Sequence, residues 1–170
     1  MRRLLLLRHA KSDWPEGMAD AERPLNDRGR ETAPLIGAFM AKQKLVPGLA
    51  LVSRARRTQE TWDLVSKELG AVEVKFDERL YGAPADTILR VIRETPADIE
   101  TLLVIGHNPG LERLAGSFAK SGDADAIRRI EKKYPTAGLA VIELPVNDWK
   151  DAAPPAGRLE MFVTPKGLEE

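Results

Sequence analysis

The chain has 170 residues, a length typical of one domain with a sizeable core. Its 26 lysines and arginines balance its 26 aspartates and glutamates, so no global field would attract nucleic acid or an anionic membrane. The absence of cysteine excludes disulfides, thiolate metal sites and a cysteine nucleophile. We therefore expect one domain over residues 1–170, in which any anion site is built from local residues.

The first seven residues, "MRRLLLL", imitate a signal peptide. Four leucines are fewer than the roughly 7–15 apolar residues that a signal peptide needs, and Arg8 and His9 interrupt them at once. No other stretch approaches the ~20 apolar residues of a membrane span. These features predict a cytoplasmic protein that uses neither a membrane nor nucleic acid as a partner.

Short apolar segments alternate with longer amphipathic ones along the chain. Strands are predicted at 4–7, 49–52, 72–76, 102–105, 138–144 and 158–164, and helices at 27–44, 54–69, 86–94 and 108–119. Pro34 should kink the first helix or move its start to Thr32. Asn108 should cap the last helix, with Pro109 at its first position. The alternation predicts an α/β fold, a three-layer α/β/α sandwich around a mostly parallel central sheet.

Nitrogen-rich side chains follow three of the predicted strands. Arg8 and His9 end the first, "SRARRTQET" (53–61) follows the second, and "GHNPG" (106–110) follows the fourth. The carboxyl ends of strands in an open parallel sheet line the crevice in which ligands bind. Both histidines of the chain lie at such ends, next to arginines and two helix N-termini, groups that suit an anion. The combination predicts a phosphate site.

Each of these features also has a plain structural interpretation. A histidine after a strand commonly caps or packs, three arginines in one helical turn commonly face solvent, and "GHNPG" could be only a good helix start. The convergence of all three on one edge favours the site. A metal site is disfavoured because arginines repel a cation and no carboxylate lies at these junctions, so we expect neither metal nor cofactor.

Together, Arg8-His9, the spacing Ser53–Arg57–Thr61 and Gly106-His107 resemble the histidine phosphatase superfamily, whose fold is called phosphoglycerate mutase-like. "RHAKSDW", "RPLNDRG" (23–29) and "GHNPGLE" (106–112) are most similar to its small SixA-like branch of phosphohistidine phosphatases. The resemblance spans roughly residues 3 to 119. It implies that fold and a metal-independent phosphatase.

The resemblance also implies roles for individual residues. His9 matches the nucleophile that becomes transiently phosphorylated, Arg8 and Arg57 match the arginines that clamp the phosphoryl group, and His107 matches the second histidine beside it. A neutral His9 can attack phosphorus through one ring nitrogen if the other donates its hydrogen to a fixed acceptor. Arginine forks bind phosphoryl oxygens in pairs, and a protonated His107, favoured by the bound phosphoryl group, would add a donor.

Three further residues match the family less directly. Arg23 resembles an additional basic contact of the SixA-like branch, and Ser12 aligns with a serine or threonine that follows the first motif in larger members. Glu78, in "ERLYG" (78–82), resembles the acidic proton donor of the mutases, although a surface glutamate explains the position equally well. Two departures from the larger members are Ala10 in place of glycine and "SDWP" (12–15) in place of serine-x-tryptophan-asparagine.

The sequence therefore predicts a phosphatase with a covalent phosphohistidine intermediate, acting on phosphohistidine in a protein. Two alternatives remain open. One is a phosphatase for a small phosphoester, and the other is a phosphate- or phosphoprotein-binding module without turnover. An intact His9 favours an enzyme. The short chain leaves little room for a lid over a small substrate, which favours a phosphorylated protein as the partner.

Overall fold

The computed structural model describes residues 1–169 and contains a seven-stranded sheet in the order β3-β2-β4-β1-β6-β7-β5. The strands are β1 (Arg2–Arg8), β2 (Leu49–Val52), β3 (Glu73–Phe76), β4 (Thr101–Gly106), β5 (Ser121–Gly122), β6 (Leu139–Leu144) and β7 (Arg158–Val163). β6 pairs antiparallel with both neighbours, and the other pairs are parallel. The predicted α/β class with a mostly parallel sheet is confirmed.

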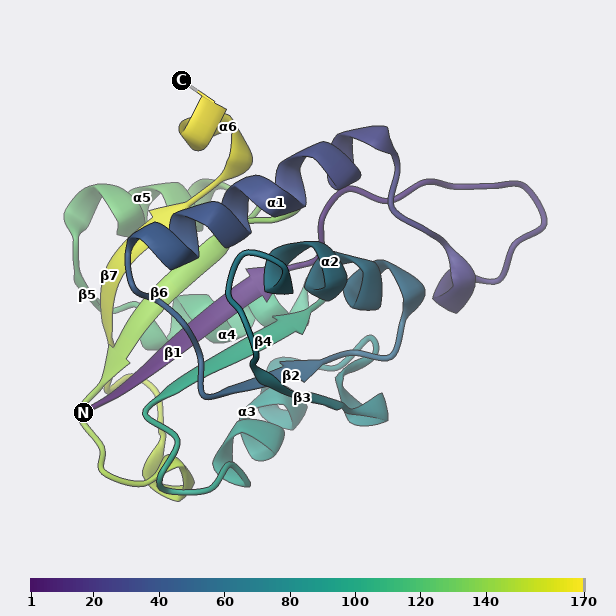
Figure 1. Cartoon of the computed structure of the whole chain (residues 1–170). Helices are drawn as coiled ribbons and strands as arrows, with labels where there is room; N and C mark the ends of the chain where they lie inside the picture. The colour runs from purple at the N-terminus through teal and green to yellow at the C-terminus, as the bar shows by residue number, and fades with distance from the viewer. Residues whose placement is uncertain (170) are drawn as a thin grey trace.

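Helices cover both faces of the sheet (Figure 1). They are α1 (Asp27–Lys42), α2 (Arg56–Ser66), α3 (Ala85–Arg93), α4 (Gly110–Phe118), α5 (Ala124–Lys132) and α6 (Pro165–Glu169), with short 3-10 turns at Asp20–Glu22, Glu78–Leu80 and Trp149–Asp151. Strand β5 and helices α5 and α6 are additions to the predicted elements. Within residues 1–169, no helix is both long enough and apolar enough to cross a membrane.

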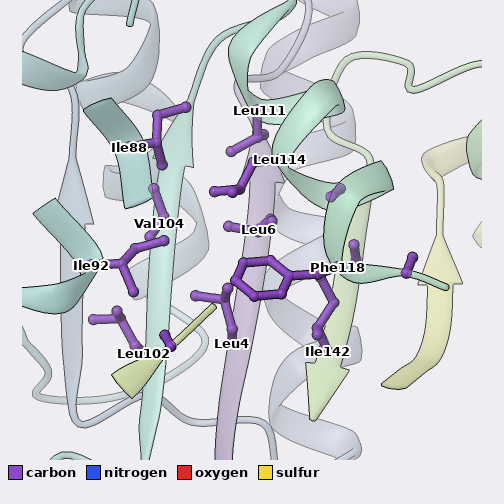
Figure 2. Close-up of a cluster of buried hydrophobic side chains, with 14 of the residues drawn as sticks. Leu4, Leu6, Ile88, Ile92, Leu102, Val104, Leu111, Leu114, Phe118 and Ile142 are labelled. Atoms are coloured by element: carbon purple, nitrogen blue, oxygen red, sulfur yellow. The ribbon is translucent and has the colours of Figure 1, made fainter. Parts of the chain in front are cut away.

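The central strand β1 shows why the sheet has two cores. Leu5 and Leu7 pack with α1 and α2 on one face, whereas Leu4 and Leu6 pack with α3, α4 and α5 on the other. Figure 2 shows the core on the face covered by α3, α4 and α5, where Phe118 of α4 lies over the strands. Successive side chains of a strand point to opposite faces, so a strand covered on both must be apolar throughout. This explains the unbroken run of leucines before Arg8.

Helix α1 starts at the first residue of the predicted range 27–44. It begins at Asp27, where the side chain of Asn26 accepts a hydrogen bond of 2.8 Å from the backbone N–H of Gly29. Pro34 lies inside the helix, so a start at Thr32 is wrong. A proline inside a helix costs about 3 kcal/mol, and here a capped N-terminus and a buried face offset that cost.

Helix α4 starts later than predicted. It begins at Gly110, and the side-chain amide of Asn108 donates to the backbone carbonyl of Tyr134 at 3.0 Å instead of capping the helix. The predicted cap at Asn108 is therefore wrong. The amide instead ties the loop after β4 to the loop before β6, across the neighbouring strand β1.

We expect Gly110→Ala to lower the free energy of unfolding by about 1–3 kcal/mol or more, because a Cβ there would lie 1.9 Å from the backbone oxygen of Ala83. Gly116→Ala in the same helix is the matched control, since a Cβ at that position meets nothing within 4 Å. The control should be neutral or gain about 0.5–1 kcal/mol from helix propensity. Urea unfolding measures both variants, and equal stabilities would contradict the close packing at Gly110.

Candidate active site

The sheet brings the three predicted motifs to one edge. β1 pairs with β4 so that Arg8 lies opposite Gly106, and β2 pairs with β4 so that Val52 lies opposite Ile105. The pairing continues past the strands, because the backbone N–H of His9 donates to Gly106 and that of Ser53 donates to Ile105. The residues after all three strands therefore meet at the carboxyl edge.

His9 is held in one orientation by its own chain. The ring is buried, and its Nδ1 lies 2.7 Å from the backbone oxygen of Ala10. A carbonyl oxygen can only accept, so Nδ1 carries the hydrogen and Nε2 keeps its lone pair. Burial lowers the pKa of His9 to about 3, helped by the charges of Arg57 and Arg8. At neutral pH the ring is thus an uncharged base with a free Nε2.

His107 lies beside it, with the two ring centroids 5.4 Å apart. Its Nδ1 is 3.4 Å from a terminal nitrogen of Arg57, and its Nε2 is 2.8 Å from Oγ of Ser53. A guanidinium can only donate, so Nδ1 accepts and Nε2 donates to the serine. Burial, followed by the charge of Arg57, lowers the pKa of His107 to about 4. Both histidines are therefore neutral in the free protein at pH 7.

The two lowered pKa values predict an acid-sensitive fold. Between the unfolded pKa of about 6.5 and the folded values of about 3 and 4, the unfolded chain binds more protons than the folded one. The stability is complete above pH 6.5 and decreases as the pH falls. We expect about 1–2 kcal/mol to be lost per histidine between pH 7 and pH 5, measured by urea unfolding. His107→Gln should reduce this pH dependence, and an unchanged slope would contradict the prediction.

The charges of two arginines, Arg57 and Arg8, lower the pKa values of both histidines. Arg57, at the start of α2, is buried and donates from both terminal nitrogens to Asp20, at 2.8 Å to its backbone oxygen and 3.1 Å to its carboxylate. Arg8 donates to the backbone oxygen of Tyr134 at 3.1 Å. The Nε atoms of both arginines are buried without a hydrogen-bond partner among residues 1–169. These unsatisfied donors suit an anion.

Arg23 and Ser12 lie at the side of this cluster. Arg23 is buried and donates to Oγ of Ser12 at 2.8 Å, to the backbone oxygen of Asp13 at 2.9 Å and to the carboxylate of Asp20 at 3.1 Å. Its guanidinium also stacks on the exposed ring of Trp14, 3.5 Å from the ring centroid. Ser12 therefore contacts Arg23, and Arg23 is connected to Arg57 through Asp20.

Two residues of the cluster were missed by the sequence analysis. Asp20 accepts from Arg57, Arg23 and the hydroxyl of Tyr81, and these hydrogen bonds hold the pKa of its carboxyl far below the usual range. The ring of Tyr81 meets that of His107 edge-on, with centroids 5.5 Å apart. Asp20 has no motif around it, whereas Tyr81 belongs to the same "ERLYG" segment that drew attention to Glu78.

The structure does not bring Glu78 to the histidines. Its side chain is 85% exposed and lies 3.8 Å from the guanidinium of Arg54. Within residues 1–169, no three histidine, cysteine, aspartate or glutamate side chains are grouped so as to hold a metal ion. The cluster as described places arginine donors around a neutral imidazole base, an arrangement that suits an anion.

Comparisons with known proteins agree with this geometry. Residues 4–83 match the family model of the histidine phosphatase superfamily (branch 1). An uncharacterized protein of Mycobacterium tuberculosis is 35% identical over 162 residues, which cover 94% of this chain and all of that protein. An uncharacterized chloroplastic protein of Arabidopsis thaliana is 31% identical, covering 96% of this chain and 78% of that one.

Solved structures share the whole fold. A putative phosphohistidine phosphatase SixA from Agrobacterium tumefaciens superposes with a TM-score of 0.82 at 27% identity, covering 96% of this chain and 97% of that one. A putative phosphohistidine phosphatase SixA from Nakamurella multipartitia gives a TM-score of 0.86 at 24% identity, with 96% of each chain covered. These likenesses extend across the sheet and the helices on both of its faces.

Proposed function

The chain belongs to the histidine phosphatase superfamily and is a phosphatase, and from this we propose that it removes phosphate from phosphohistidine in a protein through a covalent intermediate on His9. One observation carries the proposal. The bond from Nδ1 of His9 to the backbone oxygen of Ala10 leaves Nε2 as a free, uncharged nucleophile, and it lies in a cluster of arginines. We also propose a cytoplasmic location.

In the first step, the Nε2 lone pair of His9 forms a bond to phosphorus as the bond from phosphorus to the substrate's imidazole nitrogen breaks. The leaving nitrogen takes a proton from solvent. In the second step, water attacks the phosphorus of phospho-His9, which releases inorganic phosphate and returns the neutral ring. Arg8, Arg57 and His107 surround the transferred group, and the negative charge of that group raises the pKa of His107 so that it can become a donor.

The phosphoryl group competes with Asp20 for the arginines of the cluster. Asp20 occupies both terminal nitrogens of Arg57 and part of Arg23 in the free protein. A phosphoryl group carries more charge and offers three oxygens, so it is the stronger ligand for the same guanidinium groups. Asp20 is half exposed in the loop between β1 and α1, where it can withdraw without unpacking the core.

Turnover of three substrates tests the proposal: a phosphohistidine protein, a phosphoserine peptide and a generic aryl phosphate. We expect kcat/KM to be highest for the phosphohistidine protein, because its imidazole leaving group needs little acid assistance. A preference for the aryl phosphate or another small ester would replace the proposed substrate. Stoichiometric phosphate binding without release would leave only a binding module.

We expect Glu78→Gln to change kcat/KM less than about twofold on both phosphohistidine and an alkyl phosphate. Its carboxylate is exposed and paired with Arg54, so it lacks the contact with the leaving group that a general acid requires. Steady-state kinetics on the two substrates measures this. A loss confined to the alkyl phosphate, whose leaving group is poor, would instead identify Glu78 as the acid.

A further inference from the structure

A strongly basic cavity lies beside the catalytic cluster. It has a volume of about 550 Å³ and is lined by Lys11, Arg28, Lys133 and Lys166, together with threonine and proline side chains and no aspartate or glutamate. The chain as a whole has no net charge, so the three lysines and Arg28, which is itself paired with Glu169, are a local concentration of cations. A cavity of this size, with charges of one sign, suits a ligand group of the opposite sign.

The walls of the cavity are continuous with the catalytic residues. Lys11 follows His9 by two positions. The opposite wall contains Pro135 and Thr136, and it is attached to the catalytic strand because Ala137 donates its backbone N–H to the backbone oxygens of Arg8 and His9, each at 3.0 Å. A substrate whose phosphoryl group reaches His9 therefore has the cavity next to it.

The topology explains why these cations gather there. β6 runs antiparallel to β1, so the segment before β6, which includes Lys133, lies at the same edge as the end of β1. β7 in turn runs antiparallel to β6, so the segment after β7, which includes Lys166, returns to that edge. Arg28 comes from the first turn of α1. Segments far apart in sequence thus contribute to one basic surface.

The chemistry of the cavity differs from that of the catalytic cluster. Its cations are mainly lysines with exposed side chains, which bind as adaptable point charges, whereas buried arginine forks surround the histidines. The arginine of the cavity already holds a carboxylate, since Arg28 donates to Glu169 at 2.7 Å. Exposed lysines beside an arginine that already binds a carboxylate match a flexible run of carboxylates better than a second tightly clamped phosphate.

We propose that this cavity binds an acidic segment of the protein substrate, adjacent to the phosphorylated histidine. The proposal rests on the proposed function for its link to turnover, whereas binding of an acidic segment can be measured without any reaction. The site would make the enzyme select phosphohistidines that lie among aspartates and glutamates.

The test compares two phosphohistidine peptides, one with aspartates flanking the phosphorylated residue and one with serines in their place. The wild type should prefer the acidic peptide in kcat/KM, and Lys133→Glu/Lys166→Glu should reduce that preference about tenfold. Lys42→Glu/Lys67→Glu is the matched control, because these lysines lie at the C-terminal ends of α1 and α2, on the opposite edge of the sheet. The control should keep the wild-type preference.

A second measurement separates failure of this inference from failure of the proposed function. Binding of a fluorescent, unphosphorylated acidic peptide to the wild type should weaken in the Lys133→Glu/Lys166→Glu variant and in high salt. If the wild type hydrolyses neither phosphohistidine peptide, the proposed function fails while this binding still tests the cavity. Equal kcat/KM on both peptides, or equal losses in the control variant, would overturn the acidic-segment site. So would binding of inorganic pyrophosphate to a wild type that does not bind the acidic peptide.

Discussion

Replacing His9 by alanine is expected to abolish turnover, with kcat reduced on the order of 10⁴-fold or more, because nothing else in the cluster can form the bond to phosphorus. Nε2 of His9 is a free lone pair on a neutral ring, whereas both ring nitrogens of His107 are engaged by Arg57 and Ser53. Steady-state kinetics on the phosphohistidine protein, together with urea unfolding to verify the fold, measures the effect.

A trapping experiment identifies the phosphorylated atom independently. Wild-type protein quenched without acid should carry phosphate on His9, and His107→Ala should still form some of this intermediate. Phosphate mapped to a different residue, or an active His9→Ala enzyme, would rule out the covalent mechanism. A wild type that binds phosphate without releasing it would point to the binding module.

Arg57→Lys should lower kcat/KM by about 10²-fold or more even though the charge is kept. The planar guanidinium of Arg57 donates to Asp20 and to Nδ1 of His107 at the same time, and a lysine ammonium cannot reproduce that fork.

The neighbouring arginines provide matched controls: Arg56 is the first residue of α2, and Arg54 lies just before that helix. Arg54 is exposed and lies 3.8 Å from Glu78, and Arg56 is exposed and bonds Glu60 at 2.9 Å. Arg54→Lys and Arg56→Lys should therefore each change kcat/KM less than about threefold, since exposed ion pairs contribute little. Similar small effects for all three lysine variants would indicate that the three arginines are equivalent surface residues. Arg57 would then not belong to the phosphate site.

The strands were predictable from the sequence because burial on both faces of a sheet requires unbroken apolar runs. The order of polar residues after those runs also located His9, Arg57 and His107, since the carboxyl ends of parallel strands share one edge. Starts of helices were less predictable. Asn26 and Asn108 are both good capping residues, but only Asn26 caps, because the amide of Asn108 meets the carbonyl of Tyr134 from a distant segment.

The sequence by itself determined the fold class and the central catalytic candidates, because strand patterning and the residues next to strand ends are local properties of the chain. Only the tertiary structure decided which nitrogen of each histidine is free, since that depends on a carbonyl and a guanidinium brought to the ring. It also placed Asp20 on Arg57, moved Glu78 away from the histidines, and gathered Lys11, Lys133 and Lys166 around one cavity. Such contacts join residues far apart along the chain, and no spacing or periodicity within a segment encodes them.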